Sequence, residues 1–188
     1  MAHCVHRNAT SNSQYETKVN VTGTAIHEID VMRWLLNDDI VSAKIVQPRV
    51  SKYVKNGQKD PQIIVFQTKT GIIIDVETFL HCQYGYDIQC EVVGEEGTIR
   101  LPDPAQVIVR QKAKCSFDIL EDWRYRFIDA YNIEFQSWVN NTKAGIVDGP
   151  TAWDGYAAIA VAEACLKSRE TGKWEAVHIE ETPEFYLT

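Results

Sequence analysis

The sequence contains no glycine-rich motif of the kind that binds nucleotides. Its ten glycines form neither G-x-G-x-x-G nor a P-loop, so nothing in the chain is predicted to cradle a dinucleotide pyrophosphate. No apolar run approaches the roughly 18 residues of a membrane span, and no basic-then-apolar leader opens the sequence. We therefore expect a cytoplasmic protein that does not insert in a membrane and that binds any dinucleotide through residues outside this chain.

Cysteines and basic residues are too scattered for several other classes of protein. The five cysteines stand at irregular spacings without a C-x-x-C pair, so neither a disulfide framework nor a metal site is expected. The net charge is −7 and the acidic residues are dispersed, which argues against nucleic acid or an anionic membrane as partner. A small and roughly neutral partner is expected instead.

The length and composition favour a single domain over residues 1–188. With 45% hydrophobic content, a chain of this length can bury one sizeable core. The polar stretch 8–20 has no apolar periodicity and is predicted to be a loop. A helix is predicted from Thr24 to about Leu36, because apolar side chains recur there at three-residue steps (Ile26, Ile29, Met32 and Leu35).

The middle of the chain has the alternation of β-strands. Strands are predicted over 41–50, 62–68, 71–82, 86–93 and 97–101, with a less regular one at 106–111. The turns at 69–71 and 94–97 are too short for a parallel crossover, so their strands must pair antiparallel. Within 71–82, alternation places Ile74, Val76, Thr78 and Leu80 on an apolar face, and Asp75, Glu77 and His81 with Ile73 and Phe79 on a mixed face.

Two helices are predicted near the C-terminal end. The first, over 122–141, has aromatic residues at helical spacing that we expect in a core: Phe127, Tyr131, Phe135 and Trp138. The second, over 151–169, begins with a capping box at Thr151 and Asp154, ends before Gly172 and has the apolar stripe Ala152, Tyr156, Ile159, Ala162 and Leu166. The predicted fold class is α+β: an open, mostly antiparallel sheet with helices packed on one face.

Four polar positions are candidates for chemistry. His6 and Asn8 would share one strand face with Cys4 and offer the donors and acceptors that bind hydroxyl groups. His27 is predicted in the first turn of its helix, where free N–H groups disfavour the imidazolium and suit a general base. A structural histidine is the alternative. Tyr86 could place a phenol over a pocket, or Tyr84 and Tyr86 could simply pack in a turn.

Four motifs in this order resemble one known family. They are C-V-H-R-N (4–8), T-A-I-H-E-I-D (24–30), the hairpin from Q-Y-G-Y-D (83–87) to G-E-E-G (94–97), and G-P-T-A-W-D-G-Y (149–156). Together they resemble the C-terminal domain of the glucose-fructose oxidoreductase and inositol dehydrogenase family, which has a dihydrodipicolinate-reductase-like fold. The likeness covers nearly the whole chain.

The resemblance implies half of a two-domain enzyme that oxidises a ring hydroxyl of a cyclitol or related polyol to a ketone. An N-terminal Rossmann domain, absent from this chain, would bind NAD. The present domain would supply the substrate wall and an open sheet face for homo-oligomers, commonly tetramers. Because hydride transfer requires a positioned nicotinamide, the 188 residues alone are expected to be inactive.

The resemblance also implies roles for individual residues. His27 falls at the family's catalytic histidine, and His6, Asn8 and Tyr86 at positions that line the cyclitol pocket. The family usually has an aspartate four residues before that histidine, where this sequence has Gly23. This departure motivates an alternative, a silenced member that binds polyols or serves assembly. A stand-alone binding domain without a Rossmann partner is the third possibility.

Overall fold

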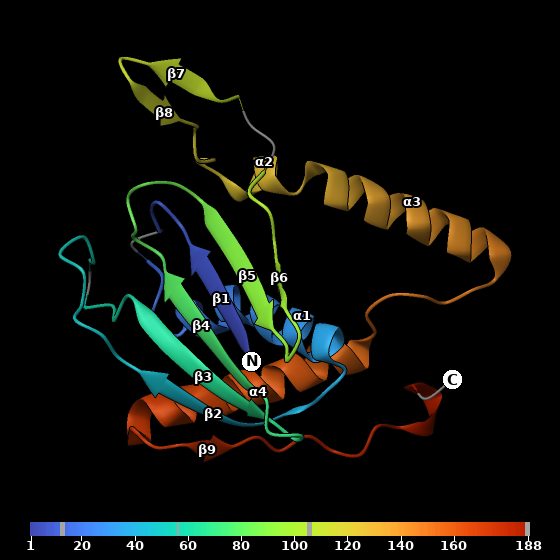
Figure 1. Cartoon of the computed structure of the whole chain (residues 1–188). Helices are drawn as coiled ribbons and strands as arrows, with labels where there is room; N and C mark the ends of the chain where they lie inside the picture. The colour runs from blue at the N-terminus through green and yellow to red at the C-terminus, as the bar shows by residue number, and fades with distance from the viewer. Residues whose placement is uncertain (12–13, 56, 105–106, 187–188) are drawn as a thin grey trace.

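A seven-stranded sheet forms the centre of the protein (Figure 1). The computed structural model describes residues 1–11, 14–55, 57–104 and 107–186. The strand order is β6-β5-β1-β4-β3-β2-β9; β1 and β4 are parallel and all other neighbours antiparallel. The strands are β1 (Ala2–Arg7), β2 (Ile40–Val46), β3 (Gln62–Thr68), β4 (Ile73–Phe79), β5 (Asp87–Val93), β6 (Thr98–Arg100) and β9 (Glu175–Ala176). The open, mostly antiparallel sheet is confirmed.

The predicted strands are present, with shorter ends. The segment 62–68 matches β3 to the residue, and the short turns after β3 and β5 do join antiparallel pairs. A separate hairpin pairs β7 (Val109–Gln111) with β8 (Lys114–Ser116). Gln106, the predicted start of this region, lies outside the described residues. Because β8 and β9 span only three and two residues, they carry too little periodicity to be predicted.

Helices α1 (Ile26–Leu36) and α4 (Ala152–Thr171) cover one face of the sheet (Figure 1). Their contact with the apolar strand face confirms helices on one side. The core there includes Ile29 and Met32 of α1, Ile74 and Val76 of β4 and Phe66 of β3. In the part of the chain that the structure describes, no helix is both long and apolar enough to cross a membrane.

The start of the first helix lies earlier than predicted. A π-helix, η1 (Asn20–Ala25), runs directly into α1. The buried stripe therefore includes Val21 and Ala25 as well as the predicted Ile29 and Met32, whereas the predicted Leu35 is 46% exposed. The wider turn of a π-helix shifts the apolar face, which a steady helical period cannot anticipate.

Helix α4 has the predicted ends but a different buried face. Thr151 and Asp154 form the capping box, which lowers the pKa of Asp154, and Gly172 ends the helix at φ 69°. The predicted stripe is only partly correct: Ala162 is buried and Leu166 packs against the core, but Ile159 is 56% exposed. Small side chains are buried instead and let the helix approach the sheet closely. They are Ala157, Ala158, Ala160, Val161, Ala162, Ala164, Cys165 and Ser168.

The predicted helix over 122–141 forms two helices, α2 (Trp123–Arg126) and α3 (Ile128–Ala144), because Phe127 leaves helical geometry at φ −119° and ψ 16°. The core role of their aromatic residues is wrong. Helix α3 has no buried residue among those described, and Phe135 and Trp138 are 64% and 65% exposed. Figure 1 shows α3 projecting away from the sheet. Periodicity identifies an apolar face but not what covers it. The remaining helix is the short 3-10 turn η2 (Glu184–Tyr186).

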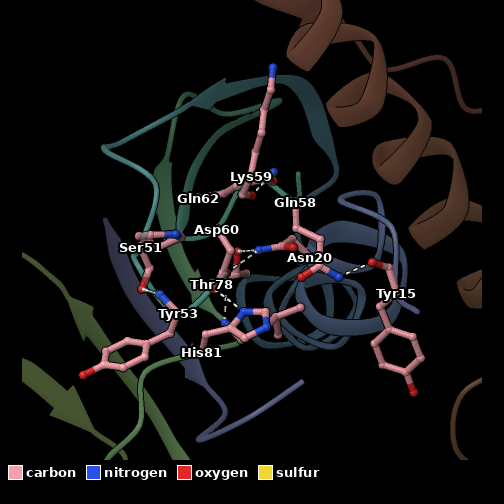
Figure 2. A network of polar contacts seen from close by, with 12 residues as sticks. Tyr15, Asn20, Ser51, Tyr53, Gln58, Lys59, Asp60, Gln62, Thr78 and His81 are labelled. Carbon is pink, nitrogen blue, oxygen red and sulfur yellow. Dashed lines mark hydrogen bonds and ion pairs between the residues drawn. The ribbon is translucent and has the colours of Figure 1, made fainter. Parts of the chain in front are cut away.

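A buried carboxylate joins the start of η1 to the end of β4 (Figure 2). Asp60 is 1% exposed; its Oδ1 accepts hydrogen bonds from Asn20 Nδ2 at 2.8 Å and from the Leu80 N–H at 2.9 Å. His81 Nδ1 lies 2.9 Å from Asp60 Oδ2. The prediction of His81 on the mixed face is wrong, because β4 ends at Phe79 and alternation ends with it. His81 instead turns inward to the carboxylate.

Replacing Asp60 with alanine should lower the free energy of unfolding by about 3 kcal/mol or more, because the buried polar groups of Asn20, Leu80 and His81 lose their acceptor. Asp39→Ala is the matched control. The Asp39 side chain is 57% exposed where it pairs with Arg33, which also lies 3.9 Å from Asp154, so this change should cost less than Asp60→Ala. Urea unfolding of both variants measures the difference. Equal losses would contradict a structural role for the buried carboxylate.

Candidate functional site

A hollow of about 1290 Å³ opens on the helix-covered side of the sheet. Its walls come from β1, from η1 and α1, from β5 and the segment after β6, and from α2 with the first residues of α3. The predicted site residues all line it: His6, Asn8, Gly23, His27 and Tyr86. The fold thus brings together positions that are up to 80 residues apart in the sequence.

Strand β1 presents its side chains as predicted. Cys4 and His6 are buried on the inner face, and Asn8 is half-buried one residue beyond the strand. Arg7 points to the other face, where its guanidinium donates two hydrogen bonds to Glu77, at 2.6 and 2.7 Å. This contact raises the pKa of Arg7. Alternation along one strand therefore separates a polar wall of the hollow from an ion pair on the open face.

The buried residue Glu28 holds His6 in place. His6 Nδ1 lies 2.8 Å from Glu28 Oε1, and both side chains are at most 10% exposed. In the tautomer with its hydrogen on Nδ1, His6 donates a hydrogen bond to this carboxylate and presents Nε2 as an acceptor. The other oxygen, Glu28 Oε2, is buried without a hydrogen-bond partner among the described residues. Glu28 therefore offers an acceptor beside the hollow that it lines.

The sequence reasoning missed Glu28, although a signal was present. Glu28 follows Ala25 by three residues and precedes Met32 by four, which places it on the buried stripe of the helix. A glutamate on such a stripe is seldom fully buried unless it is paired. The pattern alone did not identify His6, 22 residues earlier, as its partner.

Tyr86 lines the hollow, whereas Tyr84 does not. The Tyr86 ring is 8% exposed and packs edge-on against His6 at 5.8 Å and against Phe127 at 6.3 Å. Burial, with the nearby charge of Glu28, raises the pKa of Tyr86, so its hydroxyl stays protonated as a donor. The Tyr84 hydroxyl donates to Asp87 at 2.5 Å and accepts from Arg7 at 2.9 Å. The two rings therefore do not pack together as a turn.

His27 is exposed on the hollow side of α1. Its ring stacks on the ring of His6, with 6.1 Å between centroids and 25° between planes. His27 is the second residue of α1 and so lies in its first turn as predicted, but this is not a free helix start, because η1 precedes α1 and the Ile26 N–H already bonds to the Val21 carbonyl. A free helix start therefore does not support the general-base role predicted for His27. Only its place in the hollow supports a chemical role.

Gly23 lies one turn before His27 and also lines the hollow. A Cβ built on Gly23 would lie 3.0 Å from Val19 Cγ1, so a larger residue requires a small shift of Val19. The two positions line the same hollow although the boundary between π- and α-helix lies between them. An aspartate at position 23 would therefore have access to the space in front of His27.

Aromatic side chains form the outer rim of the hollow. Trp123, Phe127 and Tyr131 line it from α2 and α3, and the Trp123 and Tyr131 rings lie 6.4 Å apart. Asp122 caps α2 by accepting a 2.8 Å hydrogen bond from the Arg124 N–H. The Arg124 side chain also donates to this carboxylate and lowers the pKa of Asp122 to about 2. Over the residues described, no group of three His, Cys, Asp or Glu side chains is placed to hold a metal ion.

Comparison with known proteins finds relatives that match nearly the whole chain. Residues 15–177 match the profile of an oxidoreductase family, C-terminal alpha/beta domain. The inositol 2-dehydrogenase of Serratia proteamaculans is 52% identical over 186 residues, 99% of this chain and 55% of that protein. The inositol 2-dehydrogenase of Pseudomonas savastanoi pv. phaseolicola is 50% identical over the same shares. The chain thus spans about half the length of the curated relatives that it matches.

A solved structure agrees with these sequence matches. The crystal structure of myo-inositol dehydrogenase from Lactobacillus casei, in complex with NAD(H) and myo-inositol, superposes with a TM-score of 0.93 at 37% identity. The match covers 98% of this chain and 56% of that one. The scyllo-inositol dehydrogenase of the same organism, at 21% identity and a TM-score of 0.81, supports the fold alone.

Replacing Tyr86 with phenylalanine should change the alkaline stability of the protein. Above pH about 10, where free tyrosine ionises, the unfolded chain loses the phenolic proton and the folded protein keeps it, because the pKa of Tyr86 is raised. The free energy of unfolding of the unaltered protein therefore falls as pH rises through this window. Tyr86→Phe should reduce that fall by up to about 1.4 kcal/mol per pH unit.

Urea unfolding at a series of pH values measures the two slopes. Below pH about 9, where tyrosine is protonated in both states, the difference between the two proteins should be constant and serves as the internal control. Identical slopes above pH about 10 would show that burial does not hold the proton on Tyr86.

Proposed function

The chain belongs to the oxidoreductase family of this C-terminal alpha/beta domain, and from this premise we propose that it is the substrate-side half of an NAD-dependent inositol 2-dehydrogenase. The observation that carries the proposal is the convergence of His6, Asn8, Tyr86 and His27 on one hollow. The names of the relatives supply the substrate class. The reaction would oxidise one ring hydroxyl of a cyclitol to a ketone.

The hollow has the polar groups that a neutral polyol needs. Each hydroxyl of a cyclitol both donates and accepts hydrogen bonds, so its site requires donors and acceptors together. Glu28 Oε2 is a buried acceptor without a partner among the described residues, and the protonated Tyr86 hydroxyl is a donor. The Asn8 amide offers both. Apolar rings at the rim contact the carbon skeleton of such a ligand.

We assign His27 the role of general base. In the proposed reaction, His27 accepts the proton of one ring hydroxyl while a hydride leaves the carbon that carries this hydroxyl. The His6 ring, fixed by Glu28, stacks on one side of His27 and limits the orientations of the imidazole. Positioning of this kind accounts for much of the effect of a catalytic base.

NAD would supply the hydride acceptor when it is bound, and the sequence has no glycine-rich motif for its pyrophosphate. The segment 8–19 between β1 and η1 contains no glycine, and a backbone cradle for phosphates requires glycine where it approaches closely. We therefore place the cofactor on a Rossmann domain outside this chain. This domain supplies the residues that line the substrate site.

The open face of the sheet is the proposed contact for a homo-oligomer, a homotetramer by analogy with the family. Ile63 and Ile73 are 37% and 41% exposed there, next to the ion pair of Arg7 and Glu77. Such a mixed face is typical of interfaces. We further propose a cytoplasmic location and a role in inositol catabolism.

A second candidate function rests on Gly23. The family's aspartate is missing where its carboxylate would face His27, so a silenced member that binds a polyol without turnover is the alternative. The hollow would be retained in that case, because Gly23 is not part of the core. Turnover distinguishes the two functions.

NAD reduction by the full-length protein with myo-inositol tests the proposal. His27→Ala should reduce kcat/KM by about 10²- to 10⁴-fold, the range for losing a general base. His178→Ala is the matched control, because His178 does not line the hollow and the variant should keep the unaltered rate. Equal losses in both variants would refute the role of His27.

Gly23→Asp in the same assay separates the two candidate functions. If the natural protein turns over, Gly23 is a tolerated variation, and Gly23→Asp should change the rate less than His27→Ala does. If the natural protein is inert and Gly23→Asp restores turnover, the alternative holds. Gly23→Ala is the control for the contact with Val19 that any side chain makes at this position.

A further inference from the structure

Two free cysteines face each other in the wall of the hollow. Cys4 of β1 and Cys90 of β5 are directly opposite in the antiparallel register, and their Sγ atoms lie 3.8 Å apart. Both line the hollow. Neither has a role in the proposed oxidation of a polyol, so the pair calls for a separate explanation.

The backbone at this pair is already suitable for a disulfide. Residues directly opposite in an antiparallel pair have Cα atoms about 4.5 to 5.5 Å apart, within the range of about 4.4 to 6.8 Å that disulfides span. Closing the sulfur atoms from 3.8 Å to a bond of about 2.05 Å needs side-chain rotation rather than movement of a strand. The sheet therefore holds the two thiols within reach of each other.

The two thiols differ in reactivity. The Cys4 S–H donates to Cys90 Sγ, which lowers the pKa of Cys90 and favours its thiolate. The same contact, together with burial, raises the pKa of Cys4. Cys4 is 2% exposed and Cys90 is half-buried. A small oxidant that enters the hollow would meet the more nucleophilic sulfur first.

We propose that Cys4 and Cys90 are a redox-sensitive pair that peroxide converts to a disulfide. The Cys90 thiolate attacks hydrogen peroxide; an S–O bond forms, the O–O bond breaks, and hydroxide leaves and takes up a proton. The Cys4 sulfur then attacks Cys90, the S–O bond breaks, and the Cys4 proton leaves with that oxygen as water. Two thiols lose two electrons to one peroxide, and two waters form. A dithiol reductant reverses the change by exchange.

The disulfide would join β1 and β5 beside the ligand-binding residues. His6 follows Cys4 by two residues on the same inner face, and the bond would fix that part of the wall. The modification itself can be detected without any assay of turnover. Its test is therefore independent of the proposed dehydrogenase activity.

The test uses the full-length protein, reduced, treated with hydrogen peroxide, alkylated and digested for mass spectrometry. We expect a peptide pair linked through Cys4 and Cys90, and neither cysteine should then react with the alkylating reagent. Dithiothreitol should abolish the linked pair. Cys90→Ser should leave Cys4 fully alkylatable. Cys4→Ser should leave a sulfenic acid on Cys90 that dimedone labels. Cys115→Ser, a change at an exposed cysteine outside the hollow, should still give the linked pair.

Two results would overturn the proposal. One is that Cys4 and Cys90 remain alkylatable at peroxide concentrations that already oxidise Cys115. The other is that peroxide removes the alkylatable Cys4 thiol as fast in Cys90→Ser as in the unaltered protein, because oxidation of Cys4 would then not pass through Cys90.

Discussion

The buried carboxylate of Asp60 is the constraint on which the candidate site depends. A charge removed from water costs several kcal/mol unless its lone pairs are used. Here the two oxygens meet Asn20, Leu80 and His81. Asn20 is the first residue of η1, so the same contacts that satisfy the charge fix where the helix with Gly23, His27 and Glu28 begins. The position of one wall of the hollow follows from this network (Figure 2).

The register between β1 and β5 sets the opposite wall. It places His6 opposite Ile88, and Tyr86 lies two residues before Ile88, where its ring reaches the His6 edge. The same register places Cys4 opposite Cys90. The polar wall and the thiol pair are therefore consequences of one strand pairing. A shift of one residue would turn all of these side chains to the other face of the sheet.

Burial is unequal across the domain. Small residues of α4 seal the sheet over β2, while the aromatic side chains of α3 stay exposed. The hollow lies on the side of β1, β5 and β6 next to α1, with Trp123 and Phe127 at its rim. Exposed aromatic rings with polar tips are typical of surfaces that meet a partner or ligand. The domain is therefore tightly packed where α4 covers the sheet, whereas the candidate site lies in the open hollow beside α1.

The sequence by itself determined the α+β class, most strands, the ends of α4 and five positions that line the hollow: His6, Asn8, Gly23, His27 and Tyr86. Alternation, capping and short turns are local signals, and the order of the motifs pointed to these five positions. Only the tertiary structure decided the π-helix, the burial of His81 and Glu28, the exposure of α3 and the contact of Cys4 with Cys90. These depend on which distant residue lies opposite, because burial and pairing are properties of the partner surface rather than of the local pattern.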